Sequence, residues 1–162
     1  DRHLHTKSSF LDEIAALLGG YAAEKLVFNE LTTGASNDLK VATNMARKLV
    51  TAYGMSDTLG PVTLGESHEN VFLGRELGEH RNYSEEVAGK IDTEVGKIMR
   101  EALIRATETL TTYRTYLDII ADRLVKEETL EQEAFTDIVK DIIPASKKRL
   151  PEFEPSPAEA GA

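Results

Sequence analysis

The chain has 162 residues, 41% hydrophobic and 29% charged, so it can bury a core and is too apolar for a disordered protein. Its net charge of −9 disfavours nucleic acid as a partner, because phosphate binding depends on Lys and Arg. Cysteine is absent, which excludes disulfides and thiolate metal sites and leaves His, Asp and Glu as metal ligands. No apolar run in the sequence reaches the roughly 18 residues of a membrane span.

The two ends of the sequence differ in character. The first residue is Asp1 rather than Met, which fits either a segment of a longer protein or a start produced by processing, and we take the segment as the working hypothesis. At the other end, four of the five prolines follow residue 143, in a mixture of Pro, Glu and Ala without periodicity. We therefore expect one domain over residues 1–143 and a disordered tail over 144–162.

Apolar residues at a spacing of three to four predict a first helix over residues 9–28. Ser9 and Asp12 resemble a capping box at its start. Gly19 and Gly20 fall inside this helix, where glycine is unfavourable, so we expect another helix to approach closely there, from this chain or from a segment outside it.

Residues 31–38 are rich in capping and turn residues, and they predict a second helix from near Ser36 to Tyr53. Gly54 then fits a left-handed C-terminal cap. Residues 54–83 lose helical periodicity and are rich in glycine, so we expect a loop with a short strand at residues 62–64.

The second half of the sequence predicts helices alone. An acidic start and a continuous apolar stripe predict a long helix from Ser84 to about Thr111. The same spacing predicts shorter helices over residues 116–125 and 135–142. The expected fold class is therefore mainly α, an antiparallel helical bundle with a Gly-rich loop region.

Histidine spacing gives no metal site on its own. The four histidines, His3, His5, His68 and His80, include no H-E-x-x-H pair. His3 and His5 could chelate a metal from an extended strand, but they lie at a chain end and no third ligand is evident, so we favour the interpretation that they are a remnant of a cut site. The sequence also lacks a nucleophile elbow and a phosphate-binding glycine loop.

Asp38 lies where a carboxylate can serve either of two roles. It falls in the first turn of the second predicted helix, where free N–H groups and the helix dipole favour a negative charge. Such a carboxylate could bind a cation, but the same position is a common choice for helix stabilisation alone. The position of Asp38 in the helix, taken alone, leaves both interpretations open.

Several blocks of residues nevertheless resemble the protease domain of the FtsH-type AAA+ zinc metalloproteases, in order and in spacing. The resemblance covers about residues 1–143. Its most specific blocks are Leu17 to Glu24 and Thr32 to Leu39, followed by Tyr53 to Ser56, Phe72 to Arg75 and Ile91 to Val95.

The resemblance implies a membrane-anchored homohexamer in which an ATPase ring feeds unfolded proteins into a zinc-protease ring. It assigns Asp38 as the third zinc ligand, while the other ligands and the catalytic base belong to an H-E-x-x-H helix that this chain lacks. The ATPase domain with its ATP site and the membrane segments are outside the chain as well. We therefore expect the chain alone to be inactive, and the domain to face the cytoplasm if the source is bacterial.

Two other hypotheses remain. The chain could be a helical assembly module that lines subunit contacts of a ring without a catalytic role. It could also be a free-standing helical protein, which would leave the block from Thr32 to Leu39 unexplained. Loss of Asp38 separates the protease from the assembly module. In an assembly module it should alter oligomerisation or stability, whereas in a protease it should spare folding and abolish proteolysis.

Overall fold

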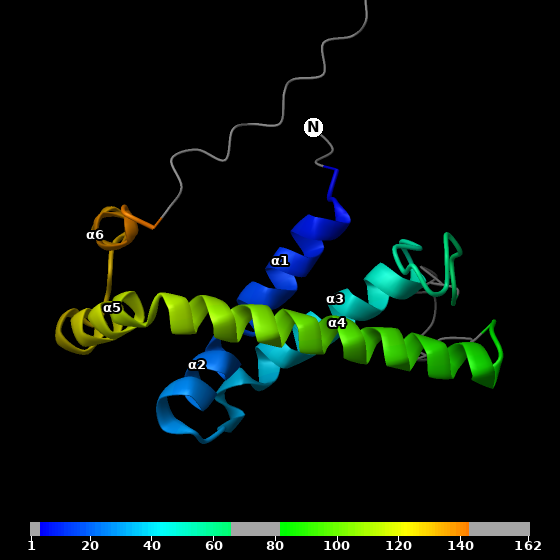
Figure 1. Cartoon of the computed structure of the whole chain (residues 1–162), viewed down its shortest axis with the longest axis horizontal. Helices are drawn as coiled ribbons and strands as arrows, with labels where there is room; N and C mark the ends of the chain where they lie inside the picture. Colours follow the sequence, from blue (N-terminus) through cyan, green and yellow to red (C-terminus); the bar gives the residue numbers. More distant parts are fainter. Residues whose placement is uncertain (1–3, 66–81, 143–162) are drawn as a thin grey trace, which may run out of the picture. The chain divides into compact units, whose positions relative to one another are not determined.

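The computed structural model describes residues 4–65 and 82–142, which are mainly helical. The chain divides into two compact units, one ending at Thr112 and the other beginning at Tyr113. The first unit contains α1 (Lys7–Leu17), α2 (Gly19–Phe28), the 3-10 helix η1 (Thr33–Ala35), α3 (Ser36–Thr51) and α4 (Glu85–Thr112) (Figure 1). The second contains α5 (Arg114–Glu127) and α6 (Gln132–Val139). The predicted mainly α fold class is confirmed.

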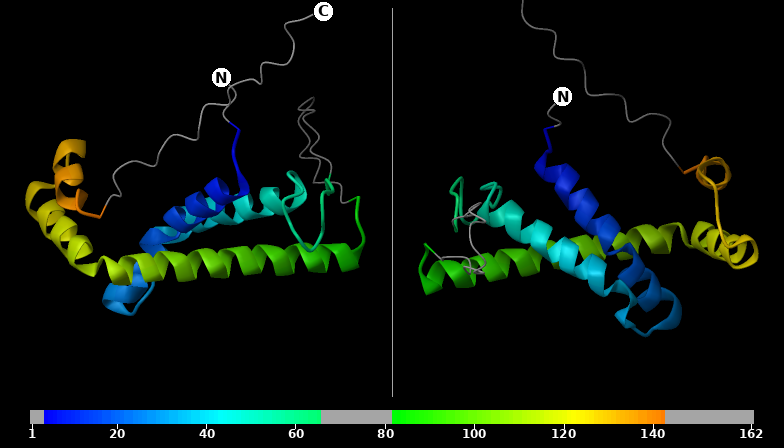
Figure 2. Two further views of the ribbon diagram at one scale, coloured as in Figure 1. Left: turned by 45° about the horizontal axis from the view of Figure 1, so that its top comes forward. Right: turned by 180° about the vertical axis from the view of Figure 1, so that it is seen from behind.

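Helix α4 is the element on which the first unit is built. It is 28 residues long and contacts α1, α2 and α3, and α1 also packs on α3. Figure 2 shows α1 and α3 on the same side of α4, and the sequence colours show that α3 and α4 run in opposite senses. The helix that carries Asp38 is thus packed against two neighbours.

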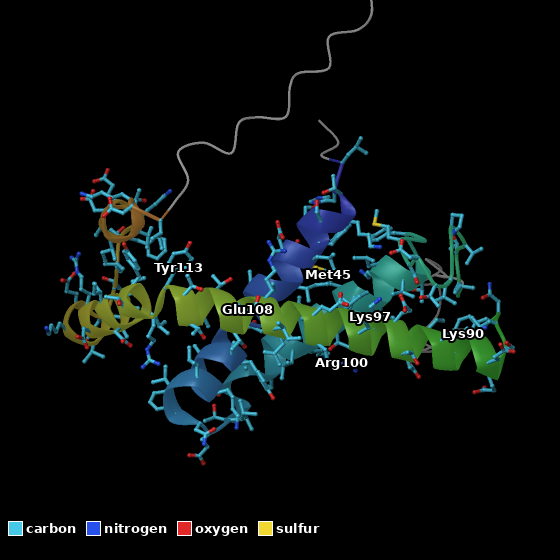
Figure 3. All side chains as sticks on the ribbon, viewed as in Figure 1. Met45, Lys90, Lys97, Arg100, Glu108 and Tyr113 are labelled. Atoms are coloured by element: carbon cyan, nitrogen blue, oxygen red, sulfur yellow. The ribbon has the colours of Figure 1, made fainter. Side chains whose placement is uncertain are left out.

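The core of this unit combines branched side chains with alanines. Ile14, Leu49 and Ile91 are completely buried, one from each of α1, α3 and α4. Alanine lets helices approach closely, and it supplies the buried positions Ala42, Ala46, Ala102 and Ala106 along α3 and α4. The opposite side of α4 carries the exposed side chains Lys90, Lys97, Arg100 and Glu108 (Figure 3).

The single helix predicted over residues 9–28 is wrong, because the chain forms two helices that separate at Leu18. The break falls directly before Gly19 and Gly20, where helix propensity is lowest. The start of α1 also differs from the predicted capping box: Thr6 is the N-cap, and its hydroxyl accepts a bond of 3.1 Å from the Ser9 N–H. A Cβ at either glycine would meet nothing within 4 Å in the described residues, so no helix of this part of the chain makes the expected close approach, and an approach by a segment outside the chain stays a prediction.

The chain leaves α3 through the predicted glycine cap. Gly54 has a φ of +59°, and Met55 N–H donates to Leu49 O at 3.0 Å. The strand predicted at residues 62–64 does not form: in the described residues the loop contains only an isolated bridge between Ser56 and Gly60. The backbone of this loop instead makes isolated hydrogen bonds, such as the one from Leu64 N–H to Thr51 O at 2.8 Å.

The second unit is small, and its two helices expose apolar as well as charged side chains. None of the residues of α5 is buried, and Val139 of α6 is. Two ion pairs at i,i+4 spacing support α5, Arg114 with Asp118 and Arg123 with Glu127. The helices predicted over 84–111, 116–125 and 135–142 are all present, with slightly different ends, and the tail prediction for 144–162 lies outside the described residues.

Membrane crossing demands a helix that is both long and apolar, and none in the described part of the chain meets that requirement.

Candidate metal site

Asp38 is the third residue of α3, as the sequence predicts, and its side chain is half-buried. Leu39, the next residue, packs against the hydrophobic core and ties this turn of the helix to the first unit. Within the described residues, the Asp38 carboxylate accepts no hydrogen bond and forms no ion pair. Its oxygens therefore have no partner in that part of the chain.

The start of α3 has no side-chain cap. Its N-cap is Ala35, whose side chain cannot accept a hydrogen bond, although the sequence places several hydroxyl and amide residues nearby. The N–H of Ser36 donates to Thr33 O, so the short helix η1 leads directly into α3. The remaining N–H groups of the first turn place the positive end of the helix beside Asp38.

The loop before α3 is held by a carboxylate of α2. Glu24 Oε2 accepts from the Thr32 backbone N–H at 3.0 Å, and Glu24 Oε1 accepts from the Thr32 hydroxyl at 2.8 Å. Thr32 Oγ1 in turn accepts from Gly34 N–H at 3.1 Å. The two hydrogen bonds from Thr32 lower the pKa of Glu24, and the bond from the backbone N–H has the larger effect. We call these three residues the Glu24 clamp.

Gly34 fits the clamp because it lacks a side chain. A Cβ at this position would lie 3.2 Å from Thr32 Oγ1 and 3.3 Å from Glu24 Oε1, closer than ordinary van der Waals contact. The next residue, Ala35, is 7% exposed and is thus anchored in the protein. The chain is consequently fixed at consecutive positions just before α3 begins.

The histidines contribute no metal site in the described residues. His5 is exposed and its ring lies 5.4 Å from the ring of Phe10, which stacks on Tyr53 at the same distance. Its contacts are thus aromatic. His3, His68 and His80 lie outside the described residues.

Zinc fits Asp38 as one ligand of a larger set. A catalytic zinc takes about three protein ligands, and a carboxylate oxygen is an accepted one. Residues 4–65 and 82–142 contain no group of three or more His, Asp and Glu residues placed to hold a metal ion. Asp38 would thus be one ligand of a zinc site whose other ligands come from outside the described residues.

Sequence reasoning missed the Glu24 clamp. Glu24 and Thr32 are eight residues apart across a turn, and helical periodicity says nothing about a bond over such a loop. The available signal was the hydroxyl-rich block from Thr32, which we interpreted only as capping and turn residues. An acid on the last turns of the preceding helix could have suggested a partner for it.

Comparison with known proteins agrees with the resemblance. Residues 1–138 match peptidase family M41. The chain is 51% identical over 140 residues to the ATP-dependent zinc metalloprotease FtsH of Pseudothermotoga lettingae, covering 86% of this chain and 22% of that protein. It is 50% identical over 138 residues to FtsH 1 of a Thermoanaerobacter species, covering 85% and 23% of the two sequences.

A third relative, the FtsH 3 protein of Symbiobacterium thermophilum, is 43% identical over 151 residues, which are 93% of this chain and 24% of that protein. The chain thus spans about a quarter or less of the curated relatives it matches. The family match, by contrast, extends over most of the chain. The chain belongs to peptidase family M41.

Proposed function

We propose that this chain is part of the peptidase domain of an ATP-dependent zinc metalloprotease, to which it contributes the third zinc ligand, Asp38. The observation that carries the proposal is the state of this carboxylate. It is half-buried on a helix packed against two others, and in the described residues it has neither a hydrogen-bond donor nor a cation beside it. A fixed and unpaired carboxylate suits a metal ligand.

The chemistry follows from the family's motif. Bound zinc would supply an activated water and polarise the scissile carbonyl group. An H-E-x-x-H helix outside this chain would provide two ligands and the glutamate that accepts the proton. The task of Asp38 is to hold one oxygen at a constant position, which the packing of Leu39 against the core supports.

The remaining features of the function concern the longer protein. Its substrates are unfolded or misfolded membrane and soluble proteins, and it works as a membrane-anchored homohexamer driven by ATP. The peptidase domain faces the cytoplasm in a bacterial cell. This chain by itself is inactive, because one carboxylate does not complete a catalytic zinc site.

A role in ring assembly is compatible with this function. Helix α5 has no buried residue, and Ile119, Leu124 and Val125 are at least 40% exposed, so apolar surface is available for neighbouring subunits. Family membership favours the protease over an assembly module without catalysis.

Degradation of an unfolded protein tests the proposal. The longer protein, with its ATPase and zinc-helix segments, should degrade an unfolded fluorescent substrate in the presence of ATP and zinc. Asp38→Asn should abolish degradation and leave ATP hydrolysis and the hexamer intact. Glu133→Gln is the matched control, since it removes a first-turn charge from α6 instead of α3. Normal degradation by Asp38→Asn would refute the assignment.

A further inference from the structure

We infer that Glu24 and Thr32 are positioning residues for the metal ligand, and that their paired hydrogen bonds set the direction in which α3 and Asp38 begin. The inference rests on the proposed function, because it takes Asp38 to be a ligand. It assigns a role to residues that neither contact the metal nor belong to the H-E-x-x-H motif.

The covalent path between the clamp and Asp38 is short and constrained. Thr32 is the N-cap of η1, and η1 ends at the residue before α3. Its hydroxyl donates to Glu24 and also accepts from Gly34 N–H, so one side chain links α2 to the first turn of η1. Only five residues separate Thr32 from Asp38, and all of them belong to η1 or α3.

Helical geometry transmits the position of the clamp. In a helix each residue is fixed relative to its neighbours, so a shift at η1 displaces the first turn of α3. Burial of Ala35 holds the C-terminal end of η1, and the Glu24 clamp holds its N-terminal end. Without the clamp, Ala35 and the packed residues of α3 remain, but the turn that carries Asp38 has greater freedom.

The two carboxylates of this region have different tasks. Both oxygens of Glu24 already accept hydrogen bonds from Thr32, whereas those of Asp38 accept none in the described residues. A positioning role explains why Glu24 is engaged with the chain and Asp38 is not. Partners that orient metal ligands typically change metal affinity about 10- to 100-fold when they are mutated.

Zinc affinity in the longer protein tests the inference, measured by competition with a chromophoric chelator. Thr32→Val keeps the shape of the side chain and removes its hydroxyl, and zinc should bind at least about tenfold more weakly. Thr32→Ser retains the hydroxyl and should restore the affinity. Glu24→Gln retains one oxygen acceptor and should give an intermediate loss, which provides a second variant if Thr32→Val fails to fold.

Thr58→Val is the matched control for general destabilisation. The Thr58 hydroxyl donates to Glu94 Oε1 at 2.8 Å, the same bond type and length as Thr32 to Glu24, but in the loop after α3. This variant should bind zinc with unchanged affinity. Equal weakening of zinc binding in Thr58→Val and Thr32→Val would overturn the inference.

A measurement without metal provides a second readout. In the metal-free chain, hydrogen exchange of the amides in the first turns of α3 should accelerate in Thr32→Val and remain normal in Thr32→Ser and Thr58→Val. Unchanged exchange in Thr32→Val would overturn the inference, because the clamp would then not restrain this turn.

Asp38→Asn separates failure of the inference from failure of the proposed function. If Asp38→Asn binds zinc as tightly as the wild type, Asp38 is not a ligand, and both proposals fall. If Asp38→Asn loses zinc while Thr32→Val retains full affinity, the proposed function survives and the positioning role of Glu24 and Thr32 is wrong.

Discussion

Ser56 and Glu94 are joined by a hydrogen bond of 3.0 Å from the serine hydroxyl to Oε2, although 38 residues separate them in the sequence. The other oxygen of Glu94 accepts from Thr58, so the loop after α3 is fixed to α4 through both oxygens of one carboxylate. Glu24 holds the loop before α3 in the same way. Each end of α3 is therefore anchored by a glutamate from another helix.

Removal of the Ser56 hydroxyl should destabilise the first unit. Ser56 is 5% exposed, and its oxygen also accepts from Leu59 N–H at 3.2 Å, so Ser56→Ala leaves two groups without their partner. We expect a loss of about 1 to 3 kcal/mol in the free energy of unfolding, measured by urea denaturation. Thr58→Val should cost less because Thr58 is exposed, and an equal loss in both variants would contradict this account.

A side chain at Gly54 should be costly for two reasons. The backbone has a positive φ of +59°, and a Cβ would lie 3.2 Å from Val62 N. Gly54→Ala should lower the free energy of unfolding by at least about 1 kcal/mol, the cost of the left-handed conformation alone. Thermal unfolding followed by circular dichroism measures the change, and wild-type stability in Gly54→Ala would show that this cap is not required.

Gly20→Ala should have the opposite effect in the isolated chain. Gly20 lies in α2 with no atom of the described residues within 4 Å of the added Cβ, so the substitution raises helix propensity without a clash. We expect stabilisation by up to about 1 kcal/mol in the same unfolding assay. A destabilised Gly20→Ala chain would reveal a contact that the described residues do not contain.

The Glu24 clamp should weaken in acid. The folded state lowers the pKa of Glu24 from its ordinary value of 4.5, so the bonds stabilise folding above pH 4.5 and are lost as the pH falls through the lower folded-state value. Carbon-13 NMR of the Glu24 carboxyl group should show its pKa rise toward 4.5 in Thr32→Val. Thr32→Val keeps the backbone N–H bond, which is the larger cause of the lowered pKa, so an unchanged titration would mean that the Thr32 hydroxyl does not contribute to it.

Periodicity predicted those parts of the fold that depend on a buried stripe. The stripe through Leu49 and the one through Ile91 gave α3 and α4 with ends correct to within about two residues. The break at Leu18 was missed because the apolar spacing continues through it, while the backbone changes course before the glycine pair. Periodicity reports which face is buried and is insensitive to a one-residue interruption.

The candidate site was predictable only in part. A first-turn acid at Asp38 follows from the sequence, but its choice between helix stabilisation and metal binding came from resemblance to a family. The Glu24 clamp was not predictable because it depends on the three-dimensional path of a loop between α2 and η1. Hydrogen bonds between side chains across a loop have no periodic signature.

Zinc content is the most direct test of the central claim that Asp38 is a zinc ligand. The measurement is elemental analysis after dialysis, on the longer protein that includes the H-E-x-x-H segment, with and without Asp38→Ala. The account predicts about one zinc per chain in the wild type, as for a single catalytic site, and a marked loss in the variant. A variant that keeps its zinc and still cleaves unfolded protein would contradict the account and leave Asp38 as a helix-stabilising residue.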